Sequence, residues 1–237
     1  YTTLFRSGEL DTVSGVEVVI GSGKNDYISL ANTGMTVTGG LGNDVMILSA
    51  GTDKITYTGA TDAGTSLTVT NTSLATDDFT IVAGTAVASV TTDYIGSFTT
   101  GTDKIVISGA LLTALNGSNG VGDADSTAIL LADNGNLDMS SGNVFIFNVD
   151  DDLATDNFGD LSGIDVAIQT TNSGTPSDGT NNQEVLYAIG NDAGTQYGLY
   201  HFKDVNGNAD HGEIAVNDII TLLAVIDAPV LAAADFT

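Results

Sequence analysis

Between residues 12 and 56, one large apolar residue recurs at every ninth position among glycine, threonine and aspartate. The recurring residues are Val19, Ile28, Val37, Met46 and Ile55. Alternation of apolar and polar residues around such positions is typical of short strands that bury one side chain each. Five positions in register exceed what chance alternation produces in an apolar-rich chain. The pattern predicts a repetitive β structure in which tight turns separate the strands.

One copy of the repeat, residues 39–47, is complete. It reads Gly-Gly-x-Gly-x-Asp-x-U-x, where U is a large apolar residue, and this is the calcium-binding nonapeptide of a parallel β-roll. Gly39, Gly40 and Gly42 allow a sharp turn with positive φ that a Cβ atom would resist. Asp44 supplies a hard oxygen ligand of the kind that calcium prefers. The motif therefore predicts a parallel β-roll with calcium-binding turns.

Degenerate copies extend the repeat on both sides. A β-roll completes one turn in two nonamers, so carboxylates 18 residues apart should stack along one edge. Asp26, Asp44 and Asp62 have this spacing, and Gly21 and Gly23 complete the first of these turns. We expect the best calcium site between the Asp26 and Asp44 turns, and a second between those of Asp44 and Asp62. The alternative is a metal-free roll, because Asp and Gly also favour turns on their own account.

Along the opposite edge of the expected roll, the row of sixth-place residues is a less complete set of carboxylates. Glu17, Met35 and Asp53 occupy the sixth place of their copies, so Met35 interrupts the row of carboxylates. For Asp53, a ligand role and a turn role both stay open.

Residues 39–47 resemble the repeat of the RTX proteins, which are exported by type I secretion systems. Residues 96–109 are similar to a segment that follows the roll in that family, with the pattern F-x-x-G-T-D-K-I-x-x-S, and Asp103 is its aspartate. Residues 231–237 are similar to the family's C-terminal export signal. The resemblance implies Ca²⁺ as the cofactor, the type I secretion machinery as a partner, and a secreted, cell-surface location.

The charge balance narrows the classes of partner. The chain has 30 Asp and Glu against 5 Lys and Arg, for a formal net charge of −25. Such a chain repels nucleic acid and anionic membranes, and divalent cations would relieve its internal repulsion. A hydrophobic content of 42% with only 15% charged residues favours a folded core over disorder. No apolar run is long enough for membrane insertion. Halophilic adaptation is the alternative explanation of the charge, but it does not explain the periodic placement of Asp in glycine turns.

The second half of the chain has a different residue pattern, in which the nonamer does not recur. Its patterns predict strands near 128–131, 144–148, 184–189, 196–203 and 219–226, and short helices near 110–115 and 157–169. We therefore predict an all-β fold with minor α content. A roll region would span residues 1–108, and a β-rich C-terminal region would span residues 109–237.

One segment of that region is a second candidate metal site. Oxygen-bearing side chains occur there at every second residue before a closing glutamate: Asp204, Asn206, Asn208, Asp210 and Glu213. The spacing resembles the front of an EF-hand loop. It departs from that loop because glycine occupies the fourth place rather than the sixth. A hairpin loop rich in Asn and Gly is the alternative.

The sequence contains no recognisable catalytic motif. There are no cysteines, His201 and His211 are the only histidines, and no Gly-x-Ser-x-Gly elbow or phosphate-binding glycine loop occurs. The residues therefore predict a protein that is not an enzyme.

Two functional hypotheses remain. In the first, the chain is an extracellular calcium-dependent structural protein that assembles with itself into a surface layer, sheath or filament, with cell-surface polysaccharide as a further candidate partner. A composition dominated by Gly, Thr, Ala, Asp and Asn supports it. In the second, the chain is the C-terminal calcium-binding folding and secretion module of a larger RTX hydrolase, toxin or adhesin.

Overall fold

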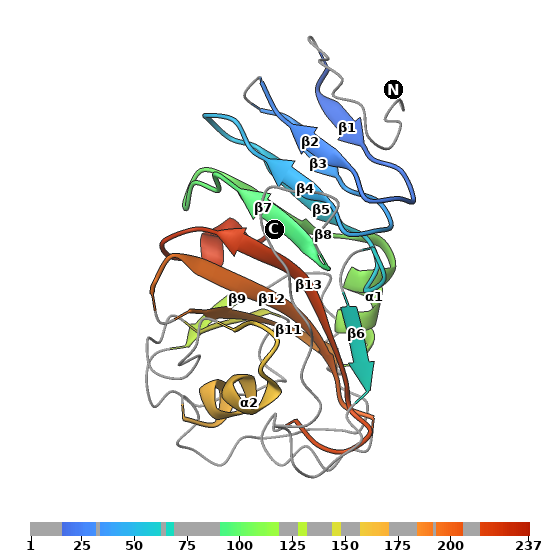
Figure 1. Cartoon of the computed structure of the whole chain (residues 1–237), viewed down its shortest axis with the longest axis vertical. Coiled ribbons are helices and arrows are strands. Elements are labelled where there is room, and N and C mark those ends of the chain that lie inside the picture. The colour runs from blue at the N-terminus through green and yellow to red at the C-terminus, as the bar shows by residue number, and fades with distance from the viewer. Residues whose placement is uncertain are drawn as a thin grey trace.

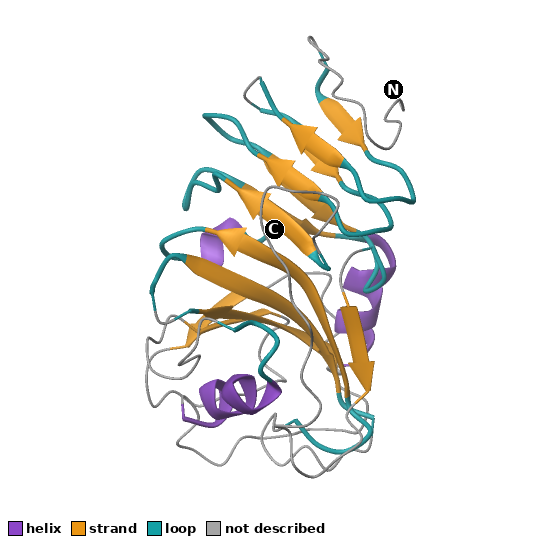
Figure 2. Ribbon diagram, viewed as in Figure 1, coloured by secondary structure: helices purple, strands orange, loops and turns teal. Residues whose placement is uncertain are grey.

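The computed structural model describes residues 16–31, 34–62, 65–68, 91–118, 128–131, 144–147, 157–170, 184–191, 193–205 and 214–237. As predicted, the fold is mostly β with minor α content. The described residues form parallel and mixed sheets and two α-helices (Figures 1 and 2). The strands of the first half are β1 Val18–Ile20, β2 Tyr27–Ser29, β3 Thr36–Thr38, β4 Val45–Ile47, β5 Lys54–Tyr57, β6 Thr65–Thr68, β7 Asp93–Gly96 and β8 Lys104–Ile107. The later elements are α1 Gly109–Ser118, β9 Ala128–Leu131, β10 Val144–Phe147, α2 Leu161–Thr170, β11 Glu184–Gly190, β12 Gln196–Lys203, β13 Ile219–Asp227 and the 3-10 helix η2 Ala233–Asp235.

Strands β1 to β5, β7 and β8 are divided between two sheets, and within each sheet they pair in parallel. Strands β1, β3, β5 and β8 form one sheet, and β2, β4 and β7 form the start of the other. Val19 pairs with Val37, and Ile28 pairs with Met46, so each neighbouring strand is shifted by two nonamers. We call β1 to β5 together with β7 and β8 the two-sheet stack.

The recurring apolar residue of each nonamer is the buried side chain of its strand. All five predicted core positions are buried, and Val37, Met46 and Ile55 have no exposed surface. In β1 and β2 the central residue is buried while both neighbours are exposed, because a three-residue strand has one inward-facing side chain. The prediction of the core of this region is therefore confirmed.

The stack is interrupted after β5. The chain leaves it to form β6, which pairs antiparallel with β13, and it returns at β7. Strand β7 then takes the next place beside β4, where Ile95 pairs with Met46, and β8 takes the next place beside β5. The steps from β4 to β7 and from β5 to β8 are therefore longer than the regular 18 residues, because the chain forms β6 in between.

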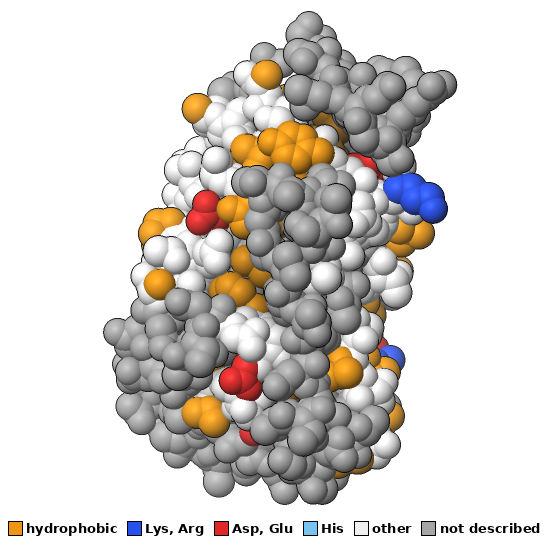
Figure 3. Space-filling model, viewed as in Figure 1, with side chains coloured by type: hydrophobic (Ala, Val, Ile, Leu, Met, Phe, Trp, Pro, Cys, Tyr) orange, Lys and Arg blue, Asp and Glu red, His pale blue; other side chains and the backbone are white. Residues whose placement is uncertain are grey.

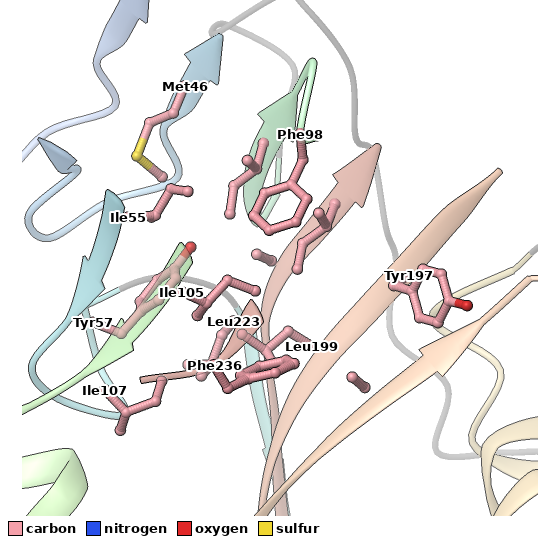
Figure 4. Packing of buried hydrophobic residues seen from close by; sticks show 14 of the residues in the cluster. Met46, Ile55, Tyr57, Phe98, Ile105, Ile107, Tyr197, Leu199, Leu223 and Phe236 are labelled. Atoms are coloured by element: carbon pink, nitrogen blue, oxygen red, sulfur yellow. The ribbon is translucent and has the colours of Figure 1, made fainter. Parts of the chain in front are cut away.

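Strand β13 joins the two-sheet stack to the rest of the molecule. It runs parallel to β7 and antiparallel to β12, so one sheet continues in the order β2-β4-β7-β13-β12-β11-β10-β9. This sheet crosses the domain boundary expected at residue 108. Apolar side chains from both regions meet beside it, as Figure 4 shows for Ile105, Leu223 and Phe236.

Helix α2 covers the opposite face of the C-terminal strands. Its first turn is capped by Asp160, whose Oδ1 accepts the amides of Ser162 (3.1 Å) and Gly163 (3.1 Å). Leu161 and Ile164 are fully buried in a cluster that includes the aromatic residues of β10 to β12. The helix thus packs against the apolar face of β10, β11 and β12.

The C-terminal residues close one end of the two-sheet stack. Phe236 forms a parallel bridge with Ile105, and the amide of Thr237 donates to the Ile105 carbonyl (3.0 Å). Leu231 and Asp235 are fully buried. Residues 231–237, whose sequence is similar to an export signal, are thus part of the folded structure.

Candidate metal centre

Two glycine turns, residues 21–26 and 39–44, lie directly on one another. A Cβ atom on Gly21 would overlap the carbonyl oxygen of Gly39, and one on Gly40 would overlap that of Ser22. Gly40 also has a φ of 104°, a backbone conformation that L side chains rarely adopt. The turns therefore approach backbone to backbone, and their carbonyl oxygens lie close together.

A row of buried aspartates follows the glycine edge. The Asp26 amide donates to Asp44 Oδ1 (2.8 Å), and the Asp44 amide donates to Asp93 Oδ1 (2.7 Å). All three carboxylates are buried. Each turn is thus bonded to the next through an aspartate side chain.

A second row of buried aspartates lies along the opposite edge of the two-sheet stack. The Met35 amide donates to Asp53 Oδ1 (2.9 Å), and the Asp53 amide donates to Asp103 Oδ1 (2.8 Å). At the end of this row, the Gly101 amide donates to Asp235 Oδ1 of the tail (2.6 Å). Met35, which has no carboxylate, ends the row toward the N-terminus.

The aspartate turns differ in the hydrogen-bond partner of the second carboxylate oxygen, Oδ2. In four of them, Oδ2 accepts the amide of the residue four places earlier: Ser22 to Asp26, Ser49 to Asp53, Thr58 to Asp62, and Thr99 to Asp103. Asp44 differs, because its Oδ2 is buried without a hydrogen-bond partner among the described residues. This oxygen points at Gly39, where a Cβ atom would collide with it. The complete nonapeptide therefore contains a buried carboxylate oxygen with no donor.

Burial makes a negative charge at this position costly. It raises the pKa of Asp44 to about 7, and the nearby Asp26 carboxylate adds to the increase. The pKa of Asp93 is also raised well above its usual value, first by burial and then by the charge of Asp44. The Tyr57 hydroxyl donates to Asp93 Oδ2 (3.0 Å), which stabilises that carboxylate without supplying positive charge. At neutral pH, a proton or a cation would therefore stabilise Asp44 and Asp93.

The donor set fits a hard cation. The two stacked turns supply carboxylate oxygens of Asp26 and Asp44 and backbone carbonyl oxygens of Ser22 and Gly39, and calcium binds six to eight oxygens of these kinds. Asp26, Asp44 and the carbonyls of Ser22 and Gly39 would hold it. Among the described residues, no group of three or more His, Cys, Asp or Glu is placed to hold a metal by side chains alone. A site here would therefore depend on backbone carbonyls.

The structure brings some of the predicted calcium ligands together and separates others. It brings Gly21, Asp26 and Asp44 together, whereas a Cβ atom on Gly23 would contact nothing. Asp62 does not accept the Asp44 amide, contrary to the expected stacking, because the excursion through β6 brings Asp93 to that place.

The remaining predicted ligands fall into four groups. Asp62 is bonded to its own turn and lies near enough to Asp93 to raise the pKa of that residue. Asp53 and Asp103 have both carboxylate oxygens occupied by amides, as a turn role requires. Asp204 is buried at the end of β12. The predicted ligands Asn206, Asn208, Asp210 and Glu213 lie outside the described residues.

Sequence reasoning missed two members of the aspartate rows. Asp93 stands two places before the buried Ile95, which is the spacing of the sixth and eighth places of the nonamer and could have revealed it. Asp235 has no such spacing, and only the folded tail brings it to Gly101.

Comparison of the sequence with protein-family models found no match, and no curated protein matched it either. In the described part of the chain, neither helix has the length and apolar character needed to span a membrane.

Proposed function

We propose that this chain is an extracellular calcium-dependent structural protein whose N-terminal region is a parallel β-roll with calcium-binding turns. The observation that carries the proposal is the buried Oδ2 of Asp44 in the one complete nonapeptide, which accepts no hydrogen bond from any residue that the structure describes. The 18-residue register of the two sheets supports it, because that register places successive glycine turns in contact. Calcium would neutralise the Asp26–Asp44 pair and so stabilise the folded roll.

The unpaired edges of β1 and β2 at one end of the described two-sheet stack support self-assembly. Among the described residues, β1 pairs only with β3, and β2 pairs only with β4. Val18, Ile20 and Tyr27 on these strands are 40%, 37% and 39% exposed, and apolar side chains are visible near the N-terminal end of the molecule in Figure 3. Open strand edges with exposed apolar residues favour pairing with another chain. The opposite end is closed by the tail and by β13, so contacts between copies would use the β1 and β2 end.

The buried tail supports the second candidate function, a folding and secretion module exported by the type I machinery. Leu231, Asp235 and Phe236 are buried in the folded protein. Folding that required calcium would leave this tail accessible where calcium is scarce and would bury it in calcium-rich surroundings. An export signal would then be available before secretion and hidden afterwards.

Replacing Asp44 with Asn should weaken calcium binding by about tenfold or more, which corresponds to ~1.4 kcal/mol. The isosteric amide keeps an acceptor for the Asp26 amide but removes the charge. The matched control is Asp53→Asn, which puts an NH₂ group against the Ser49 amide and should lower stability without changing calcium affinity. Titration calorimetry and thermal unfolding in chelator separate the two effects. Equal calcium affinities of the two variants would contradict the assignment of the site.

Addition of calcium should convert the chain from small particles in chelator to ordered sheets or filaments. Subunits with a formal charge of −25 repel one another, and contact becomes favourable when cations neutralise the acidic turns. Negative-stain microscopy and sedimentation across a calcium series measure this outcome. The control is Ile20→Lys, which places a charge on the exposed edge of β1 and should block assembly without preventing folding. A protein that folds with calcium yet stays monomeric at high concentration would favour the secretion module instead.

A further inference from the structure

The second row of buried aspartates differs from the first in its supply of positive charge. Two aspartates of the second row are each followed directly by a lysine: Asp53 by Lys54 and Asp103 by Lys104. In the first row, the corresponding residues are not basic: Tyr27, Val45 and Tyr94. The whole chain has only 5 Lys and Arg. The second row is therefore the edge to which the chain brings positive charge of its own.

Lys104 reaches the last turn of the second row with its ammonium group. Its Nζ donates to the carbonyl of Gly101 (3.4 Å) and lies 3.8 Å from Oδ1 of Asp235 in the C-terminal tail, residues 231–237. The Gly101 amide donates to the same oxygen of Asp235 (2.6 Å), so the three residues form a closed set of contacts. A turn carbonyl and a carboxylate oxygen are also ligands of the kind that calcium takes. The ammonium group thus has the kinds of neighbour that a metal ion would have.

The carboxylate that Lys104 meets is completely buried. Asp235 has no exposed surface, whereas the Lys104 side chain is 21% exposed. The amides of Gly101 and Ala232 (2.9 Å) donate to Oδ1 and Oδ2 of Asp235, but amides carry no net charge. Removing the cationic partner of a buried carboxylate leaves an uncompensated charge in a poorly solvated place. Lys104 is the basic residue that supplies the positive charge here.

Lys54 provides an internal comparison. It pairs with Lys104 in the register of β5 and β8, and it also follows an aspartate. Its side chain is exposed, and it forms no ion pair within the part of the chain that the structure describes. The two lysines therefore have the same local position, and the contact with the tail distinguishes them.

We propose that Lys104 is a built-in cation that latches the C-terminal tail, as a calcium ion would hold two glycine turns together. The latch keeps the tail on β8, where the Thr237 amide donates to the Ile105 carbonyl (3.0 Å) and the Ile107 amide donates to the Thr237 main-chain oxygen (3.0 Å). This latch goes beyond the proposed calcium function, and it shares no residue with the Asp44 site. The glycine edge would take its cation from solution, whereas the opposite edge is closed by a side chain of the protein itself.

Hydrogen exchange of the full chain in saturating calcium measures the latch at the tail amides. Lys104→Met keeps a long apolar stem but removes the charge, and it should make the amides of residues 231–237 exchange about tenfold faster. Lys104→Arg should restore most of the protection, because it returns the positive charge. The matched control Lys54→Met removes a lysine at the paired position and should leave the tail unchanged. Equal exchange in Lys104→Met and the wild type would overturn the proposal, as would the same increase in Lys54→Met.

Native mass spectrometry with calcium tests whether a metal ion holds the last turn instead. Asp235→Asn should keep the ion count of the wild type, because the ammonium group of Lys104 takes the place of an ion. Loss of an ion in this variant would overturn the proposal. Failure of the roll site gives a different result: Asp44→Asn would then keep its ion count, while the effect of Lys104→Met on the tail amides would persist.

Discussion

Chelation of calcium should unfold the two-sheet stack and expand the chain. Without the ion, the buried Asp26, Asp44 and Asp93 carboxylates repel one another, and Asp44 Oδ2 has no donor in the part of the chain that the structure describes. A ligand present at about 100 times its Kd stabilises the folded state by ~2.7 kcal/mol per site. For a chain of this size, that free energy raises the Tm by about 5–10 °C per site.

Circular dichroism, thermal unfolding and small-angle X-ray scattering in chelator and in millimolar calcium measure this effect. Magnesium at the same concentration is the matched control, because it demands octahedral geometry and dehydrates reluctantly, so it should restore less structure. A spectrum and a Tm that do not change between chelator and calcium would contradict calcium-linked folding.

Replacing Gly40 with Ala should destabilise the calcium-loaded protein by about 3 kcal/mol or more, with a fall in Tm of about 6–12 °C. The new methyl group would overlap the backbone carbonyl of Ser22, which cannot rotate away as a side chain can. The positive φ of 104° adds a cost of its own. Because the two turns would separate, calcium affinity should fall together with stability.

Gly23→Ala is the matched control for this prediction. Gly23 belongs to the neighbouring turn, but a Cβ atom there has nothing within 4 Å, and its φ is not in the positive range. Its effect on stability should stay within about 0.5 kcal/mol. Comparable losses in the two variants would show that the turns do not stack as the structure has them.

The sequence by itself determined the repeating core and one edge of the stack. Val37, Met46 and Ile55 are buried because a strand alternates its side chains and the nonamer returns one of them inward at each step. The contact between Asp26 and Asp44 follows from the same period, since two nonamers bring the chain back to the same edge. Local spacing is sufficient for such features.

Only the tertiary structure decided where the repeat is interrupted. The sequence places Asp62 next to Asp44, yet Asp93 occupies that position because β6 leaves the stack to pair with β13. That pairing joins residues about 150 positions apart (Ser66 lies 155 residues before Thr221), which no local period encodes. The C-terminal tail reaches Ile105 for the same reason.

The tertiary structure also decided which carboxylates lack a partner. Asp44, Asp53 and Asp103 follow turns of similar sequence. The amides of Ser49 and Thr99 occupy Oδ2 in the last two, whereas no described residue donates to Asp44 Oδ2. Whether an aspartate binds an amide, a proton or a cation depends on the donors that the fold brings to it, because burial removes the water that would otherwise satisfy it.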